Sequence, residues 1–318
     1  MSASSDLLVV ARDLRLSYGE RWALNGLSFA VAAGEVVGLL GPNGVGKTTT
    51  LSVLATLRRP HAGSAEVAGA DTQRAAAAVR RALGYVPQNL AVYPTLTAAE
   101  NAAFFARLFG LGGSAGAEAV GRALSLVGLE ERAGDVVSTF SGGMQRRLNL
   151  ACGLLHSPRV MLLDEPTVGV DPQSRERIFE AVRRQADNGA AVLYSTHYME
   201  EAERLCDRVL LVDGGRLVAE GTPSALIAEA GGGTRLEVST RVPLPAGWLD
   251  RVPQARGLDE ARAVDGGFLA RVALEDLAGA ATVLERAAAL GGGVLDFHLH
   301  QPNLQEVFLR LTGHDLRD

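Results

Sequence analysis

The sequence predicts an α/β protein with a mostly parallel sheet, and two observations carry this prediction. Apolar, β-prone runs at residues 160–163, 191–195 and 209–212 alternate with segments of helical periodicity, an order typical of parallel sheets. The second observation is the glycine-rich octapeptide 41–48, which follows an apolar run at 36–40 and precedes a helical run. Strand, glycine-rich loop and helix are the local context of a phosphate-binding loop.

The other elements of the N-terminal region follow from periodicity and turn residues. Residues 7–40 alternate apolar and polar segments around turns near Gly19 and Gly34, which predicts an N-terminal antiparallel β lobe. Helical periodicity dominates from about residue 95 to residue 158, so we expect an inserted helical lobe with a loop at 112–116.

The glycine triplet at 231–233 marks a linker. We therefore expect a first domain over residues 1–230 and a small C-terminal α/β appendix over residues 231–318. Within the appendix the pattern predicts strands at 235–240, 267–274 and 294–299, and helices at 275–290 and 303–311.

Composition excludes several classes of protein. Of the 318 residues, 47% are hydrophobic and 21% are charged, which is the balance of a globular chain. The net charge of −5 gives no general attraction to nucleic acid, so no nucleic-acid partner is expected. We find neither a secretory signal nor an apolar stretch long enough to cross a membrane. Cys152 and Cys206 suit a reducing compartment and are expected in the core.

The octapeptide has the full form G-x-x-x-x-G-K-T, with the residues Gly41, Pro42, Asn43, Gly44, Val45, Gly46, Lys47 and Thr48. Backbone N–H groups of such a loop converge on phosphate oxygens, and the helix N-terminus adds positive potential. Lys47 is expected to reach the outer phosphates, Thr48 to bind Mg²⁺, and Thr49 to belong to the same nucleotide site. The alternative is a glycine-rich turn that matches by chance, and the flanking strand and helix argue against it.

Two carboxylates end the apolar run at 160–163. Unpaired carboxylates are costly to remove from water, so Asp164 and Glu165 favour a functional role over packing. We expect Asp164 to hold the Mg²⁺ shell and Glu165 to polarise the attacking water. The alternative is a solvated strand end.

A second candidate anion site begins another helix. Ser141, Gly142 and Gly143 precede an apolar helical run at 148–155, and a serine with two glycines exposes backbone N–H groups there. Taken alone, this triplet is typical of an ordinary helix N-cap.

With these motifs in this order, the chain resembles the nucleotide-binding subunits of ATP-binding cassette (ABC) transporters. The signature of that family is typically L-S-G-G-Q, and here Phe140 and Met144 stand at its first and fifth positions. The resemblance implies the P-loop NTPase cassette fold and an ATPase that uses ATP and Mg²⁺.

The resemblance also implies roles for four further residues. Gln88 matches the glutamine that contacts Mg²⁺ and signals to the membrane partner, and His197 matches the histidine that bonds the γ-phosphate. Asp171 matches an aspartate at the dimer seam, and Tyr18 an aromatic residue under adenine. Three of them have a plainer interpretation: Gln88 as a loop residue, His197 as a structural histidine and Tyr18 as a turn residue.

The implied function is the ATP-hydrolysing subunit of an exporter. Residues 196–203 and 302–313 resemble the drug-resistance branch typified by daunorubicin exporters, whose relatives also serve lipid, polysaccharide and antibiotic export. Two such chains, or this chain and a related cassette, would enclose two ATP molecules and drive separate permease subunits from the cytoplasmic face of the cell membrane. The alternatives are a soluble, non-transport ABC ATPase and an ATP-dependent assembly module.

The appendix leaves two interpretations open. The resemblance suggests a dimer contact or a regulatory piece, whereas the plain alternative is a stabilising lid. His298 and His300 share one face of an expected strand, but two ligands make an incomplete metal site, so surface histidines are the preferred interpretation.

Overall fold

The computed structural model describes residues 6–229, 234–250, 252, 255–264, 266–275 and 277–313. The chain forms two compact units that divide between Pro223 and Ser224, and residues 311–313 group with the first unit. The expected linker at 231–233 lies outside the described residues. The division falls before it because helix α8 (Pro223–Glu229) belongs almost wholly to the second unit.

The first unit is built on a six-stranded sheet with the order β10-β9-β3-β8-β7-β6. Adjacent strands of this sheet run parallel to each other, except that β10 is antiparallel to β9. The predicted mostly parallel sheet is therefore confirmed. The central strands read as continuous apolar runs because both of their faces are buried. The strands are β3 (Val36–Leu40), β6 (Leu83–Val86), β7 (Val160–Asp164), β8 (Ala191–Thr196), β9 (Arg208–Asp213) and β10 (Arg216–Gly221).

A second, antiparallel sheet forms the predicted N-terminal β lobe. Its order is β2-β1-β4-β5, from β1 (Leu7–Tyr18), β2 (Arg21–Ala32), β4 (Ala62–Val67) and β5 (Ala70–Asp71). Helix α1 (Lys47–Leu54) contacts both this sheet and strand β7 of the parallel sheet. Its buried Leu51 and Leu54 share one core with Leu24 and Leu39, which come from the two sheets. This burial fixes the loop that precedes the helix.

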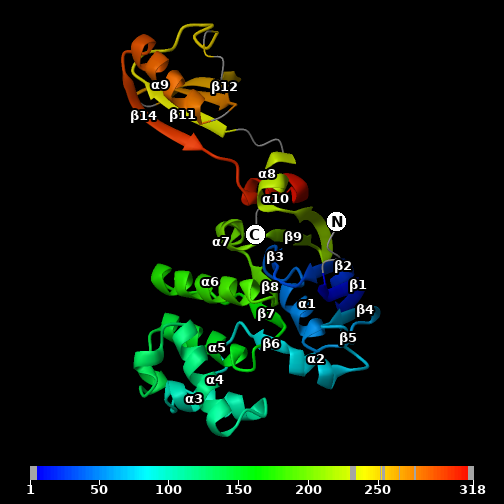
Figure 1. Cartoon of the computed structure of the whole chain (residues 1–318). Helices are drawn as coiled ribbons and strands as arrows, with labels where there is room; N and C mark the ends of the chain where they lie inside the picture. Colours follow the sequence, from blue (N-terminus) through cyan, green and yellow to red (C-terminus); the bar gives the residue numbers. More distant parts are fainter. Residues whose placement is uncertain are drawn as a thin grey trace. The chain divides into compact units, whose positions relative to one another are not determined.

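The helical lobe consists of α3 (Ala98–Leu108), α4 (Gly113–Leu126) and α5 (Gly142–Leu154) (Figure 1). Helix α3 begins with a capping box between Thr97 and Glu100. The loop predicted at 112–116 was wrong, because α4 already begins at Gly113. Small residues on one face of α4, such as Gly116 and Ala119, are buried against its neighbouring helices, and this tertiary packing outweighs the weak helix propensity of glycine.

Three further helices complete the first unit: α2 (Ala76–Ala82), α6 (Pro172–Asp187) and α7 (Met199–Leu205). Helix α6 contacts both α5 and β8, so it connects the helical lobe to the parallel sheet. Within the described residues, no helix combines the length and apolarity needed to span a bilayer.

The second unit is an antiparallel sheet of order β12-β13-β11-β14, with α9 packed on it. Its core includes Leu236, Val238, Val272, Val283 and Ala287. The predicted strands and helices are present, but β12 was missed because its sequence mixes charged residues and glycine without clear alternation. The elements are β11 (Thr234–Thr240), β12 (Ala255–Val264), β13 (Gly267–Leu274), α9 (Ala278–Leu290), β14 (Val294–His300) and α10 (Leu304–Thr312).

Candidate nucleotide site

The phosphate loop leaves the end of β3 and enters α1, and its glycines are required by close packing. Gly46 has a φ of +108°, and a Cβ there would lie 2.1 Å from the carbonyl oxygen of Ala23 in β2. A Cβ on Gly41 would lie 2.3 Å from the carbonyl oxygen of Val212 in β9. Because only glycine fits at both ends, the curved loop is held against the strands on either side of it.

Lys47 lies inside this loop, with only 4% of its surface exposed. Its Nζ donates hydrogen bonds to the carbonyl oxygens of Gly41 (2.7 Å) and Pro42 (3.0 Å). It also lies 3.4 Å from Glu165 Oε1. Burial lowers the pKa of Lys47, and the neighbouring Glu165 carboxylate opposes that shift. The loop therefore holds an ammonium group among carbonyl and carboxylate oxygens.

Asp164 ends β7 next to the start of α1. Its Oδ1 accepts hydrogen bonds from Ser195 Oγ (2.8 Å) and from Thr48 Oγ1 (3.2 Å). Burial raises the pKa of the Asp164 carboxyl, and these two hydrogen bonds partly oppose the rise. Strand pairing thus brings together an aspartate and a threonine that are far apart in the sequence.

The raised pKa of Asp164 predicts a pH-dependent stability of the nucleotide-free protein. A carboxyl whose pKa rises on folding stabilises the fold below its unfolded pKa, and this contribution is lost as pH rises through the folded pKa. Asp164→Asn should therefore raise the melting temperature near neutral pH, and the gain should shrink in acid. Thermal unfolding between about pH 5 and pH 8 measures this, with the exposed Glu118→Gln as control. A loss of stability at every pH would contradict it.

Glu165 is the point where the predicted catalytic residues meet. Its Oε2 accepts a hydrogen bond from Gln88 Nε2 (3.1 Å), and its Oε1 lies 3.2 Å from His197 Nδ1. Its backbone adopts a φ of +46°, a left-handed conformation that costs a non-glycine residue about 1–3 kcal/mol. The backbone N–H donates to Ser195 Oγ (3.1 Å), which helps to hold this conformation.

The donor set around Thr48 and Asp164 fits Mg²⁺. A hydroxyl and a carboxylate oxygen are 3.2 Å apart, and hard oxygen donors are the ligands that Mg²⁺ prefers. Two adjacent buried carboxylates, Asp164 and Glu165, face the ammonium of Lys47, so a further cation would balance the charge. The described residues hold no cluster of three His, Cys, Asp or Glu ligands. Mg²⁺ does not need one, because one or two carboxylates with substrate phosphates and water suffice.

Ser141, Gly142, Gly143 and Asp171 gather at a second place, the N-terminal ends of α5 and α6. Ser141 caps α5 by accepting a hydrogen bond from the Met144 N–H (3.3 Å). Asp171 caps α6 by accepting a hydrogen bond from the Ser174 N–H (2.8 Å), and this bond lowers the pKa of the Asp171 carboxyl. A Cβ on Gly143 would lie 2.5 Å from Asp171 Oδ2, so the two helix starts are packed together.

This second group is separate from the phosphate loop within one chain. No hydrogen bond or ion pair among the described residues joins Ser141, Gly142, Gly143 or Asp171 to residues 41–48. Ser141 and Gly142 are exposed at the helix start. Their backbone N–H groups are thus free to face a ligand outside the chain.

Tyr18 ends β1 and is 50% exposed. The Arg58 guanidinium lies 5.9 Å from the centroid of its ring. Across the turn, Arg21 Nη2 donates to the carbonyl oxygen of Gly44 (3.2 Å), which holds the β1–β2 turn against the phosphate loop. An exposed ring beside this turn is compatible with the predicted stacking on adenine.

Sequence reasoning missed two supporting residues close to the carboxylates. Ser195 donates to the Asp164 carboxylate and accepts from the backbone N–H of Glu165. Arg146, in the first turns of α5, donates to the carbonyl oxygen of Gln88. Nothing in the sequence around Arg146 indicates this contact, because the contact depends on how α5 packs beside the loop after β6.

A buried carboxylate supports the segment that carries His197. Glu201 accepts hydrogen bonds from Tyr194 Oη (2.9 Å) and Thr196 Oγ1 (3.0 Å), and also from Thr167. The Tyr198 N–H in turn donates to Thr196 Oγ1 (3.0 Å). The chain is therefore held on both sides of His197. In the sequence this glutamate stood only within the run 196–203 that resembles the drug-resistance branch. A carboxylate among the apolar residues Met199, Ala202 and Leu205 is the signal that could have found it.

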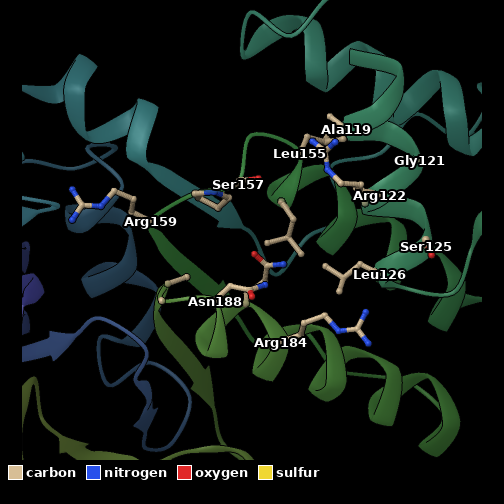
Figure 2. Close-up of a pocket in the computed structure, with 16 residues that line it drawn as sticks. Ala119, Gly121, Arg122, Ser125, Leu126, Leu155, Ser157, Arg159, Arg184 and Asn188 are labelled. Atoms are coloured by element: carbon tan, nitrogen blue, oxygen red, sulfur yellow. The ribbon is translucent and has the colours of Figure 1, made fainter. Parts of the chain in front are cut away.

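A cavity of about 820 Å³ lies away from both groups, at the C-terminal ends of α5 and α6 beside α4 (Figure 2). Arg122, Arg159 and Arg184 are among its lining residues, and none of the predicted site residues is. The cavity is therefore no part of the candidate nucleotide site.

Comparison with known proteins identifies the family. The family model described as "ABC transporter" matches residues 24–168. The chain is also 38% identical to the linearmycin resistance ATP-binding protein LnrL of Bacillus subtilis, over 98% of this chain and 100% of that protein. The chain belongs to the ABC transporter family. The resemblance inferred from the ordered motifs is confirmed, and this ABC protein is an ATPase subunit whose nucleotide is ATP.

Two further relatives place the cassette in the predicted branch. It is 39% identical to the daunorubicin resistance ATP-binding protein DrrA3 of Streptomyces coeruleorubidus, over 98% of both chains. It is 41% identical to the Nod factor export ATP-binding protein I of Paraburkholderia xenovorans, over 96% of this chain and 97% of that protein. The drug-resistance branch is therefore confirmed.

A solved structure supports the fold class. An ATP-binding cassette described as a dimeric post-hydrolysis state with ADP and Pi matches with a TM-score of 0.61 and 26% identity. The match covers 67% of this chain and 98% of that chain. The predicted P-loop cassette fold is confirmed.

Proposed function

We propose that this cassette is the ATPase subunit of an exporter, in which two cassettes enclose two ATP molecules and drive separate permease subunits. The observation that carries the proposal is the division of the predicted site residues into two groups. Lys47, Gln88 and His197 converge on Glu165, whereas Ser141 lies apart at an exposed helix start.

The first group supplies the binding and the chemistry. Lys47 would exchange its bonds to the Gly41 and Pro42 carbonyl oxygens for phosphate oxygens, and the N–H groups of the phosphate loop and of Thr49 would bind the same phosphates. Thr48, Asp164 and Gln88 would hold Mg²⁺, which, when bound, supplies positive charge to the phosphates.

Glu165 is proposed as the general base that takes a proton from the attacking water. Gln88 and His197 contact the two oxygens of its carboxylate, so they orient it, and the left-handed backbone directs it toward the loop. His197 is proposed to reach the γ-phosphate as well, from a segment that Glu201 holds in place.

The second group is proposed to complete the site of another cassette. The start of α5 combines exposed backbone N–H groups with the positive end of a helix dipole, which suits the γ-phosphate of ATP bound to the partner. Asp171, packed against Gly143, would lie at the same seam. Tyr18 is proposed to stack on adenine.

The relatives suggest the cargo and the location. Their names refer to resistance to linearmycin and daunorubicin and to export of Nod factor. We propose a drug-like, lipid or polysaccharide cargo, a homodimer or a pair with a related cassette, and a peripheral position on the cytoplasmic face of the membrane.

The experiment that tests the shared site is Ser141→Arg. Because Ser141 does not contact the phosphate loop of its own chain, this variant should retain ATP binding but lose turnover by about 10²–10³-fold, the cost of removing donors to a developing charge. Equilibrium ATP binding and phosphate release measure the two properties. Ser114→Arg, another exposed serine in the first turn of a helix of the same lobe, is the control and should leave both unchanged. Full turnover by Ser141→Arg would overturn the two-chain site.

A further inference from the structure

Strand β14 forms an open edge of the sheet in the second unit, with an exposed apolar row. Among the residues that the structure describes, the sheet order β12-β13-β11-β14 leaves β14 with one neighbour, β11 (Figure 1). Leu295, Phe297 and Leu299 are 48%, 53% and 40% exposed. Isolated exposed apolar residues are ordinary, but three at alternate positions on an edge strand form a surface for another strand.

The apolar row continues the core of the unit. Phe297 pairs with Val238 and Leu299 pairs with Leu236, and paired residues point to the same face of a sheet. Val238 and Leu236 are fully buried in the core. The side chains on β14 therefore extend this buried face to the sheet edge, where they stay partly exposed although α9 contacts both β11 and β14.

The β14 edge has little of the usual protection against strand pairing. Its pairing with β11 is regular from Arg235↔His300 to Ser239↔Asp296 and has one irregularity, at Leu295, before Thr240↔Val294, whereas the other edge strand, β12, has two irregularities in its pairing with β13. Irregularities, lysine and proline discourage edge pairing, and β14 contains neither lysine nor proline. In its middle, the Phe297 N–H donates to Asp296 Oδ1 (2.8 Å), a local bond of the kind that substitutes for a missing strand partner.

The sequence of β14 is complementary to itself in the antiparallel direction. With a two-fold axis at Phe297, Leu295 faces Leu299 of the second copy and Asp296 faces its His298. Moving the axis by one residue would place Asp296 opposite Asp296, or His298 opposite His298. Like groups directly opposite each other are unfavourable, so charge selects the axis at Phe297.

We propose that β14 pairs with β14 of a second copy of this chain about Phe297, joining two four-stranded sheets into one. Asp296 and His298 of one chain are now 3.3 Å apart and largely exposed, and an exposed pair of this kind contributes little to stability. In the dimer, Asp296 and His298 of each chain would instead contact His298 and Asp296 of the second copy. The apolar row would be buried. This interface needs no nucleotide, and it keeps two cassettes at a high effective concentration between cycles of ATP hydrolysis.

Cysteine cross-linking of the full chain tests the register. The experiment uses nucleotide-free protein with a chelator and a mild oxidant. Phe297→Cys should form a covalent dimer, because the two Cα atoms would lie within the range of a disulfide. Neither Leu295→Cys nor Leu299→Cys should cross-link alone, since the two identical cysteines of such a dimer would lie about 13 Å apart along the strand. A mixture of the two variants should cross-link, because position 295 of one chain faces position 299 of the other. The native Cys152 and Cys206 are buried, and wild-type protein is the blank.

Two further measurements separate this interface from other contacts. Cross-linking of Phe297→Cys should persist when Lys47→Met is added, because the interface is independent of ATP. Phe297→Lys should convert a nucleotide-free dimer into a monomer in light scattering. If that variant fails to fold by circular dichroism, the cross-linking pattern still decides. A nucleotide-free monomer that does not cross-link through Phe297→Cys, equal cross-linking of all three single variants, or cross-linking only to another protein would overturn the proposal.

Discussion

Replacing Glu165 with glutamine should lower ATP turnover by about 10²–10⁴-fold and leave ATP binding intact. Glutamine keeps the size of the side chain and one of the two oxygens, which can still accept the hydrogen bond from Gln88, but it cannot take a proton from water. The phosphate loop lies in a different segment and keeps Lys47. Single-turnover phosphate release, measured beside equilibrium ATP binding, separates the two effects.

The control for this variant is Glu180→Gln, the same chemical change at an exposed position of α6. It should alter neither binding nor turnover. Unchanged turnover in Glu165→Gln would remove Glu165 from the role of base. A parallel loss of ATP binding would instead indicate that glutamine had disturbed the phosphate loop.

Replacing Lys47 with methionine should have the largest effect on the nucleotide-free protein and on ATP binding together. Lys47 is buried between two loop carbonyl oxygens and Glu165, and removing one member of a buried ion pair costs about 3 kcal/mol of unfolding free energy. Methionine has a similar shape but no charge, so ATP binding should weaken by about 10–100-fold. Denaturant unfolding and equilibrium ATP binding provide the two measurements.

The double variant Lys47→Met/Glu165→Gln distinguishes charge from shape. If the cost comes from leaving the Glu165 carboxylate without its cation, neutralising Glu165 should recover most of the lost stability but none of the ATP binding. A double variant that is as unstable as Lys47→Met would assign the cost to the lost bonds with Gly41 and Pro42.

The motifs that could be predicted from the sequence are those made of contiguous residues. The phosphate loop was predictable because its chemistry depends on backbone N–H groups and one lysine within a single turn, so spacing alone describes it. Asp164 and Glu165 were predictable because charges at the end of an apolar strand are costly without a partner. The parallel sheet followed from alternating strands and helices.

The contacts among these motifs were not predictable, because they join separate strands. Ser195 contacts the Asp164 carboxylate and the Glu165 backbone N–H because β8 lies between β3 and β7 in the sheet. Arg146 contacts the Gln88 carbonyl because α5 packs beside β6. The family resemblance implied which residues act together, but not that three of them would meet at the side chain of Glu165.

The helix boundary of α4 and the strand β12 show the same limit. Gly113 begins a helix because small residues of α4 are buried against other helices. Intrinsic helix propensity does not include such tertiary packing. Strand β12 forms at a sheet edge, where pairing with β13 holds residues whose own pattern does not indicate a strand.

By itself, the sequence predicted the phosphate-binding loop and the order of most strands and helices, since both depend on neighbours along the chain. The tertiary structure alone decided what surrounds Glu165 and which surfaces remain open. In β14 the alternation of Leu295, Phe297 and Leu299 indicates a buried face, and only the sheet order shows that this face reaches an open edge. The physical reason is that burial depends on which strand lies next in the sheet, and that neighbour comes from a distant part of the chain.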